Sequence, residues 1–293
     1  MPPEHVETHK RVVALGSMNG RERLRLIAAG LPVLHQSAEE LIQAEAALPR
    51  EHQRARGMLL GQADEEAAKA LILLDAIRCP PRRQQDINRT LGNFYQHLAR
   101  LLYAEACRWH AMSLSKLDEY LRMDRYSHYL DGPNDVDFVY RNRALDSRDC
   151  FLYADLVDHN GELEWQIPGP RFGSIIPPEH DFLGVNVPEP KALPLVRALT
   201  RIGAFKLEGL RLIQQIWRPL ALEAETSWLE IEKLNKATLD RLKERGLFEN
   251  VSDEDIRRVI DWQFPMYPLD FVPIRVTKEE FEEERARAEE YFI

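Results

Sequence analysis

The sequence predicts a mainly α-helical protein: an up-and-down bundle of about four or five long helices with one inserted β-hairpin and a helical C-terminal extension. Apolar residues recur every three or four positions over most of the chain, and strand-like alternation occurs only within residues 150–167. Acidic side chains gather at the end, because residues 223–293 carry a net charge of −8 and residues 1–222 carry −1. We therefore expect a leader (1–20), a bundle containing the hairpin (21–222) and an acidic helical extension (223–293).

The first half of the chain predicts three long helices. The first spans residues 21–48, and Pro32 should kink or split it because proline lacks the amide hydrogen that a helix interior needs. The second spans about 50–77 and should end at Cys79-Pro80-Pro81. The third begins near residue 83 and continues beyond 121, with a possible break near Ser113. Residues 1–19 have no clear helical pattern and predict a loose leader.

The second half begins with the hairpin. Strands are expected at 151–157 and 163–167, joined by Asn160-Gly161, a dipeptide that favours tight hairpin turns. Residues 168–190 contain six prolines and predict irregular structure. The remaining patterns predict further helices at residues 193–220, 224–245, 253–263 and 278–291.

Composition bounds the class of protein. The chain has 293 residues, of which 44% are hydrophobic and 30% charged, as in soluble globular proteins. It has no apolar run of the ~18 residues that a membrane span needs, so we expect no membrane partner. Cys79, Cys107 and Cys150 are far apart in sequence, which predicts a reducing cytoplasmic location and argues against a disulfide framework or a zinc site. Phosphate-loop, dinucleotide, zinc-protease and serine-nucleophile motifs are absent, so we expect no metal and no cofactor.

A charged pair stands at the start of the most apolar segment. Glu65 and Lys69 lie one helical turn apart and lead into residues 70–77, which are apolar nearly all round. Ile72 continues their side of the helix, so we expect the pair to face another helix or a second subunit. The same surplus of apolar surface predicts a homodimer.

The third predicted helix carries a possible chemical site. If that helix is continuous, Arg89, Asn93, His97 and Arg100 share an arc of about 80°. Histidine can take up or release a proton near neutral pH, and arginine can hold a phosphate, so this set suits cleavage of RNA without a metal. Residues 78–148 carry a net charge of +3, which leaves room for such a surface. The alternative is a solvent-facing polar stripe with no function.

Three stretches resemble the AbiV-type abortive-infection proteins of bacteria, a branch of the HEPN superfamily. They are the paired glutamates Glu65 and Glu66 followed by Lys69, the aromatic–histidine–basic run at residues 94–100, and Arg148 followed by the Leu-Tyr-x-Asp run at residues 152–155. They occur in the family's order and cover roughly residues 20–220.

The resemblance implies a HEPN-like helical bundle that dimerises and places an arginine–histidine pair at the dimer interface. In HEPN ribonucleases four to six residues separate the arginine from this histidine, and five residues separate Arg122 from His128. About three such spacings are expected by chance here, so the spacing alone is no evidence. The polar arc of the third predicted helix and this spacing together make Arg89, His97, Arg100, Arg122 and His128 the candidate catalytic residues.

The resemblance also supplies supporting residues. Glu65, Glu66 and Lys69 could orient the arginine or histidine, as a buried carboxylate orients a general base, or could form a structural ion pair between core helices. Arg148, Tyr153 and Asp155 lie around the first predicted strand. Tyr153 and Asp155 are expected on one face of that strand and could share a hydrogen-bond network, or all three residues could be structural. Asn93 completes the supporting set.

The implied function is an anti-phage effector, a metal-independent ribonuclease that acts on RNA, halts translation on infection and is activated by a phage-encoded protein. A second hypothesis is a non-catalytic interaction protein that binds a phage protein or a translation component. Convergence of Arg89, His97, Arg100, Arg122 and His128 in one concave site would favour the nuclease, and scattered positions would favour the binding protein.

Overall fold

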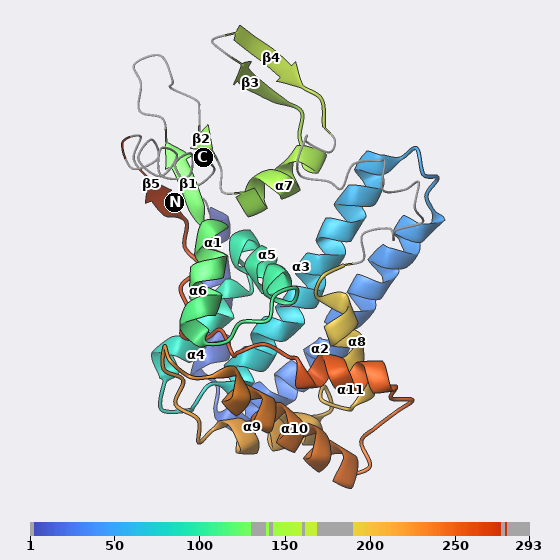
Figure 1. Ribbon diagram of the computed structural model, residues 1–293, viewed down its shortest axis with the longest axis vertical. Coiled ribbons are helices and arrows are strands. Elements are labelled where there is room, and N and C mark those ends of the chain that lie inside the picture. The colour runs from blue at the N-terminus through green and yellow to red at the C-terminus, as the bar shows by residue number, and fades with distance from the viewer. Residues whose placement is uncertain are drawn as a thin grey trace, which may run out of the picture.

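The computed structural model describes residues 3–129, 139–140, 143–159, 162–168, 190–276 and 279 (Figure 1). The protein is mainly α-helical, as predicted. Within these residues lie eleven helices: α1 Pro3–Ser17, α2 Gly20–Ala47, α3 Gln53–Arg78, α4 Gln84–Asn93, α5 His97–Ala106, α6 Leu114–Met123, α7 Arg143–Leu152, α8 Leu193–Arg201, α9 Leu207–Trp217, α10 Trp228–Glu244 and α11 Asp253–Ile260. The strands are β1 Tyr126–Tyr129, β2 Val139–Tyr140, β3 Asp155–His159, β4 Glu162–Gln166 and β5 Ile274–Val276.

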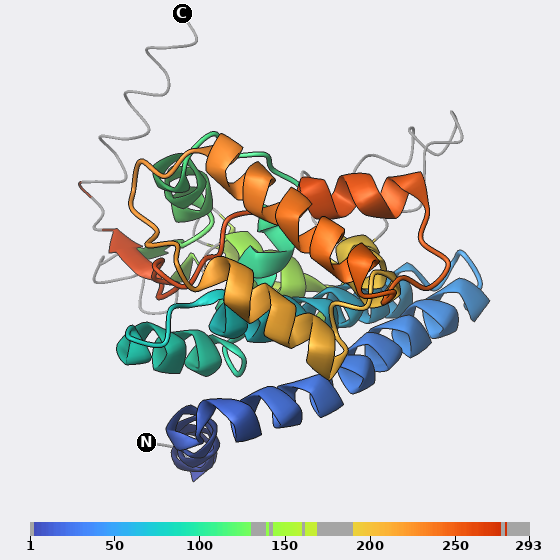
Figure 2. The ribbon, with the colours of Figure 1, turned by 90° about the horizontal axis from the view of Figure 1, so that it is seen from below.

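Helix α3 is the centre of the fold. The long α2 runs back along one side of it, while α4, α5 and α7 contact it elsewhere (Figure 1). Helices α8 and α9 cover a further side, and α10 and α11 pack over them, so that α3 lies between α2 and this C-terminal layer (Figure 2). None of the helices in the described part is long and apolar enough to cross a membrane.

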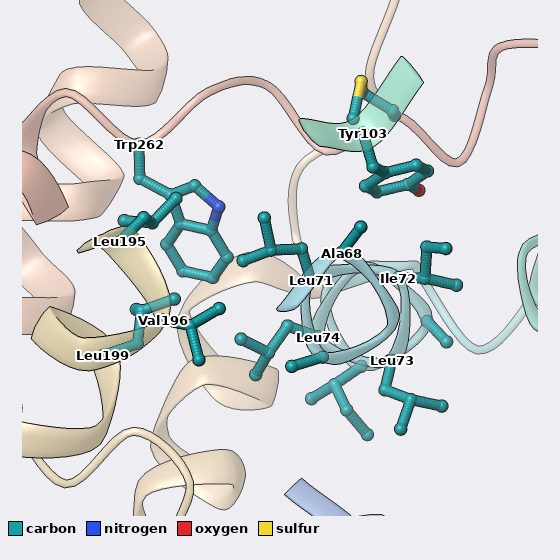
Figure 3. Close-up of a cluster of buried hydrophobic side chains, with 14 of the residues drawn as sticks. Ala68, Leu71, Ile72, Leu73, Leu74, Tyr103, Leu195, Val196, Leu199 and Trp262 are labelled. Carbon is teal, nitrogen blue, oxygen red and sulfur yellow. The ribbon is translucent and has the colours of Figure 1, made fainter. Parts of the chain in front are cut away.

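The apolar segment of α3 is buried within one chain. Every residue from Ala70 to Ile77 is buried, and Figure 3 shows leucine and isoleucine side chains leaving the helix in several directions toward Tyr103 of α5, residues of α8 and Trp262. A helix that is apolar nearly all round needs cover on all sides, and here the same chain provides it. The apolar surface of residues 70–77 that suggested a homodimer is therefore buried within one chain.

The C-terminal residues belong to this same core, so residue 222 does not separate two hydrophobic cores. Trp262, Phe264 and Met266 are buried with α3. The backbone N–H of Met266 donates to Asp75 at 2.6 Å, and Arg78 donates to the Gln263 carbonyl at 3.0 Å. Although residues 223–293 are acidic as a sequence, the buried apolar side chains between residues 228 and 271 are a structural part of the bundle.

The helix predicted to begin near residue 83 is in fact three helices, α4, α5 and α6. After Gly92 the chain makes a short turn at residues 94–96, and Gln96 is extended before α5 begins at His97. Glycine weakens a helix interior, and the turn lets Phe94 pack on the core instead of continuing the helix. The continuous polar arc expected from Arg89 to Arg100 is therefore wrong.

Other helix boundaries follow local signals closely or differ for identifiable reasons. Helix α3 ends before Pro80, as predicted. Helix α2 is not split at Pro32, which lies on its exposed side, where the carbonyl that loses its partner can be solvated. The expected leader forms α1. The helix expected at 193–220 is interrupted by a turn at Gly203, whose φ of +77° is accessible to glycine at little cost.

Antiparallel pairing joins β3 and β4, with Leu156 opposite Trp165. The first strand begins at Asp155, not at Phe151, because residues 148–152 belong to α7. Tyr153 precedes the strand, so the expected shared strand face of Tyr153 and Asp155 is wrong. A second sheet, ordered β2-β1-β5, was not predicted. The Asn160-Gly161 turn, most of the proline-rich segment and the helix expected at 278–291 lie outside the described residues.

Candidate active site

Glu65 of α3 is the centre of a charged cluster. Its side chain is 2% exposed and accepts hydrogen bonds from three cationic or ionisable side chains. The distances are 2.7 Å to Nδ1 of His97, 3.0 Å to Nη1 of Arg100 and 2.9 Å to Nε of Arg148. Residues far apart in the sequence thus share one carboxylate.

Helix α5 brings two of these partners together. His97 is its first residue, and Arg100 follows at the spacing that places side chains on one face of a helix. Arg100 also donates from Nε to the Phe94 carbonyl at 2.8 Å. This bond ties the turn at residues 94–96 to the helix, so the break in the predicted long helix is what orients His97 toward Glu65.

Helix α7 contributes the third partner, Arg148. Arg54 of α3 donates to the carbonyls of Phe151 and Leu152 at the end of α7, each at 2.9 Å. The Phe151 ring lies so close to Gly57 that a Cβ there would be 2.5 Å from it, which leaves room only for glycine. Arg54 and Gly57 thereby dock α7 on α3. Sequence reasoning missed both, because neither residue stands in a motif and both act only through this docking.

The cluster keeps Glu65 ionised. Burial alone would raise the pKa of Glu65, but the hydrogen bond and charge of His97, the charge of Arg148 and the hydrogen bond from Arg100 outweigh burial and hold the pKa below its usual value. Arg148 has a further partner in Asp149, at 2.6 Å. The carboxylate at the centre can therefore only accept hydrogen bonds, so Nδ1 of His97 is the donor.

His97 connects this buried carboxylate to solvent. Its side chain is 46% exposed, and no other hydrogen bond to it is formed by the residues that the structure describes. The imidazole thus has Nδ1 held by Glu65 and Nε2 available for exchange with a bound molecule. A carboxylate behind an imidazole sets its tautomer and orientation, and the adjacent guanidiniums suit an anionic group.

Other predicted residues lie beside the cluster without joining it. Lys69 pairs with Glu66 at 2.5 Å, so the expected pairing of Glu65 with Lys69 is wrong, although Glu65 does face other helices. Lys69 also lies over the Phe94 ring, 5.6 Å from its centroid. Asn93 is buried at the end of α4.

The remaining predicted residues are placed elsewhere. Arg89 donates to Asp86 at 2.8 Å and to the Tyr267 carbonyl at 2.7 Å, both outside the cluster. Arg122 lines a separate cavity against residues 268–274. His128 belongs to β1 and Asp155 to β3, but their side chains lie outside the described part. Tyr153 is mostly exposed after α7. Of the five candidate catalytic residues, only His97 and Arg100 are shown to converge.

Two further searches, for metal-binding groups among the described residues and for similar proteins, found nothing to compare with this cluster. Within the described ranges, no group of three or more His, Cys, Asp or Glu residues could hold a metal ion. Comparisons with protein-family models, with curated proteins and with solved structures found no match to this chain.

Proposed function

We propose that this chain is a metal-independent endoribonuclease whose chemistry centres on His97. The observation that supports it most directly is the 2.7 Å hydrogen bond from His97 to the buried Glu65, which leaves the other imidazole nitrogen available beside Arg100 and Arg148. General acid–base catalysis needs such an oriented imidazole. Cleavage of a phosphodiester also needs positive charge near the phosphate.

The proposed reaction uses the 2′-hydroxyl of RNA as the nucleophile. Nε2 of His97 takes its proton while the oxygen attacks the adjacent phosphorus, and the bond from phosphorus to the 5′-oxygen breaks. The leaving oxygen takes a proton from a general acid, either water or the His97 of a second copy, so the products are a 2′,3′-cyclic phosphate and a 5′-hydroxyl. Glu65 orients His97, and the guanidiniums of Arg100 and Arg148 attract the phosphate.

The biological setting rests on the resemblance to AbiV-type proteins. On that basis the ribonuclease is an anti-phage abortive-infection effector with a HEPN-like bundle, which a phage protein activates and which then halts translation. The homodimer belongs to the same proposal. A second copy would supply a second His97, able to act as the acid while the first acts as the base.

A different observation favours the second candidate function, a non-catalytic interaction protein. The β3–β4 hairpin exposes Leu156, Leu163, Trp165 and Ile167, and a cluster of exposed apolar side chains is typical of a binding surface. Such a protein would bind a phage protein or a translation component through this hairpin, with the Glu65 cluster holding α7 in place.

Cleavage of total RNA in the presence of EDTA separates the two functions. We expect wild type to cleave and His97→Ala to lose about 10²–10⁴-fold in rate, the usual effect of removing a general base. His52→Ala is the matched control. His52 is also exposed and directly precedes α3, but its side chain forms no capping hydrogen bond with that helix. Cleavage that EDTA abolishes, or His97→Ala as active as His52→Ala, would contradict the ribonuclease proposal.

A further inference from the structure

A cavity of about 480 Å³ lies between α6 and the segment that precedes β5. It is built from other elements than the Glu65 cluster, which uses α3, α5 and α7. Its volume is within the roughly 300–1,000 Å³ of small-molecule sites. Its lining residues are Asp118, Arg122, Arg125, Pro268, Leu269, Asp270 and Ile274.

Arg125 is the residue that points to a ligand. Its side chain is 10% exposed, yet it makes few hydrogen bonds for a buried guanidinium. Nε donates to the Val272 carbonyl at 3.2 Å, and Nη1 reaches Asp118 only at 3.5 Å, the outer limit for such a bond. No residue of the described ranges accepts a hydrogen bond from Nη2.

Arg78 is a contrasting case. It also makes two side-chain hydrogen bonds, to Asp75 and to the Gln263 carbonyl, and its Nε has no partner, but its side chain is 0% exposed and two tryptophan rings enclose it, so no ligand can reach it. A buried charge is costly unless its donors are satisfied. Arg125 instead lines an open cavity with donors to spare, an arrangement suited to binding an anion.

The other lining residues define the rest of the ligand. Arg122 adds a second guanidinium, and two guanidiniums in one cavity suit a phosphate group. Asp118 and Asp270 would repel a bare anion but accept hydrogen bonds from hydroxyl groups beside it. The side chains of Leu269 and Ile274, with Pro268, offer an apolar surface for a flat ring.

We propose that this cavity binds a ribose phosphate, with the phosphate on Arg122 and Arg125 and the ribose hydroxyls on Asp118 and Asp270. The same chemistry occurs in a free mononucleotide and at the phosphorylated end of an RNA. The proposal does not depend on the ribonuclease activity, because no residue of the Glu65 cluster lines the cavity.

Calorimetric titration of the full chain tests the site. The probes are AMP, inorganic phosphate, adenosine, and a short RNA with either a 5′-phosphate or a 5′-hydroxyl. We expect AMP, the 5′-phosphorylated RNA or both to bind. Phosphate and adenosine should bind at least ~10-fold more weakly, because each lacks one half of the contacts. The AMP and RNA arms distinguish the two sources.

Two variants tie binding to the cavity. Arg122→Gln and Asp270→Asn should each weaken binding at least ~10-fold, the usual effect of losing a hydrogen bond to a charged group. Lys116→Gln is the control, because Lys116 is an exposed cation on the same helix that does not line the cavity. Absence of binding by both AMP and phosphorylated RNA overturns the proposal. So does inorganic phosphate binding as tightly as AMP, or unchanged affinity in both variants when they retain the wild-type circular dichroism spectrum.

Discussion

Two buried carboxylates on α3, Glu65 and Asp75, belong to networks of different kinds. Asp75 accepts hydrogen bonds from Tyr103, Arg78 and the backbone of Met266 at 3.0, 3.1 and 2.6 Å. Arg78 lies between the rings of Trp217 and Trp262, 3.8 and 4.0 Å from their centroids. That network is closed to solvent on all sides, whereas the Glu65 network ends at the exposed His97.

The pKa values of the two carboxyl groups also shift in opposite directions. Burial raises the pKa of Asp75 above its usual value, despite the charge of Arg78 and the hydrogen bonds from Met266 and Tyr103. The pKa of Glu65 is lowered, because burial is outweighed by His97, Arg148 and Arg100. Arg78 is itself so buried that desolvation lowers its pKa to about 10. The closed network has one buried cation, whereas the open network has several cations and ends at a histidine that solvent can reach.

The largest loss of stability is expected for Arg78→Met. This variant leaves Asp75 buried without a cation and should cost about 3–5 kcal/mol of unfolding free energy, measured by urea denaturation. The double variant Asp75→Asn with Arg78→Met should lose less than Arg78→Met alone, because no unpaired charge remains. A loss below about 1 kcal/mol in Arg78→Met would show that the closed network is not structural.

An intermediate loss of stability is expected for Glu65→Gln. The amide removes the charge that three side chains share, and we expect a loss of about 1–3 kcal/mol at neutral pH. A carboxyl whose pKa is lowered on folding stabilises the protein above its unfolded value of about 4.5 and loses that contribution as the pH falls through the folded pKa.

The sign of this pH dependence can be tested directly. The difference in unfolding free energy between wild type and Glu65→Gln should shrink as the pH is lowered from 6 through about 4.5 and below. A difference that grows on acidification would mean that the pKa of Glu65 is raised, like that of Asp75, and the contrast between the two networks would fail.

The smallest effect on stability is expected for His97→Ala. Nearly half of this side chain is exposed, and Glu65 keeps Arg100 and Arg148 after its removal. The unfolding free energy should fall by about 0.5–1.5 kcal/mol, the usual net contribution of one hydrogen bond. A loss above about 2 kcal/mol would place His97 among the structural residues and remove the distinction from the closed network.

Local signals predicted much of the fold. The helical periodicity predicted the mainly α-helical class, and Pro80-Pro81 predicted the end of α3. The apolar surroundings of Glu65 predicted that it faces other helices, which the contacts with α5 and α7 confirm. Each of these features depends on residues close together in the sequence, where backbone geometry and burial act directly on the pattern.

The errors have a common cause in contacts between distant residues. The break after Asn93 allows Phe94 to reach the core. Helix α7 replaces the first part of a predicted strand, because Arg54 of α3 binds the backbone carbonyls at its end and Glu65 of α3 binds Arg148. Likewise, the charge of residues 223–293 suggested a separate layer. The buried apolar side chains between residues 228 and 271 nevertheless share one core with α3, because burial depends on where side chains meet and not on net charge.

By itself, the sequence determined that this chain is helical, that residues 70–77 are core and that Glu65 faces another helix, because the periodicity of apolar residues is a local property. Only the tertiary structure decided which partners Glu65 has. His97 and Arg100 reach it through a turn that interrupts a helical pattern, and Arg148 reaches it from 83 residues away. A hydrogen bond depends on position in space to within a few tenths of an ångström, and packing of the whole chain sets that position.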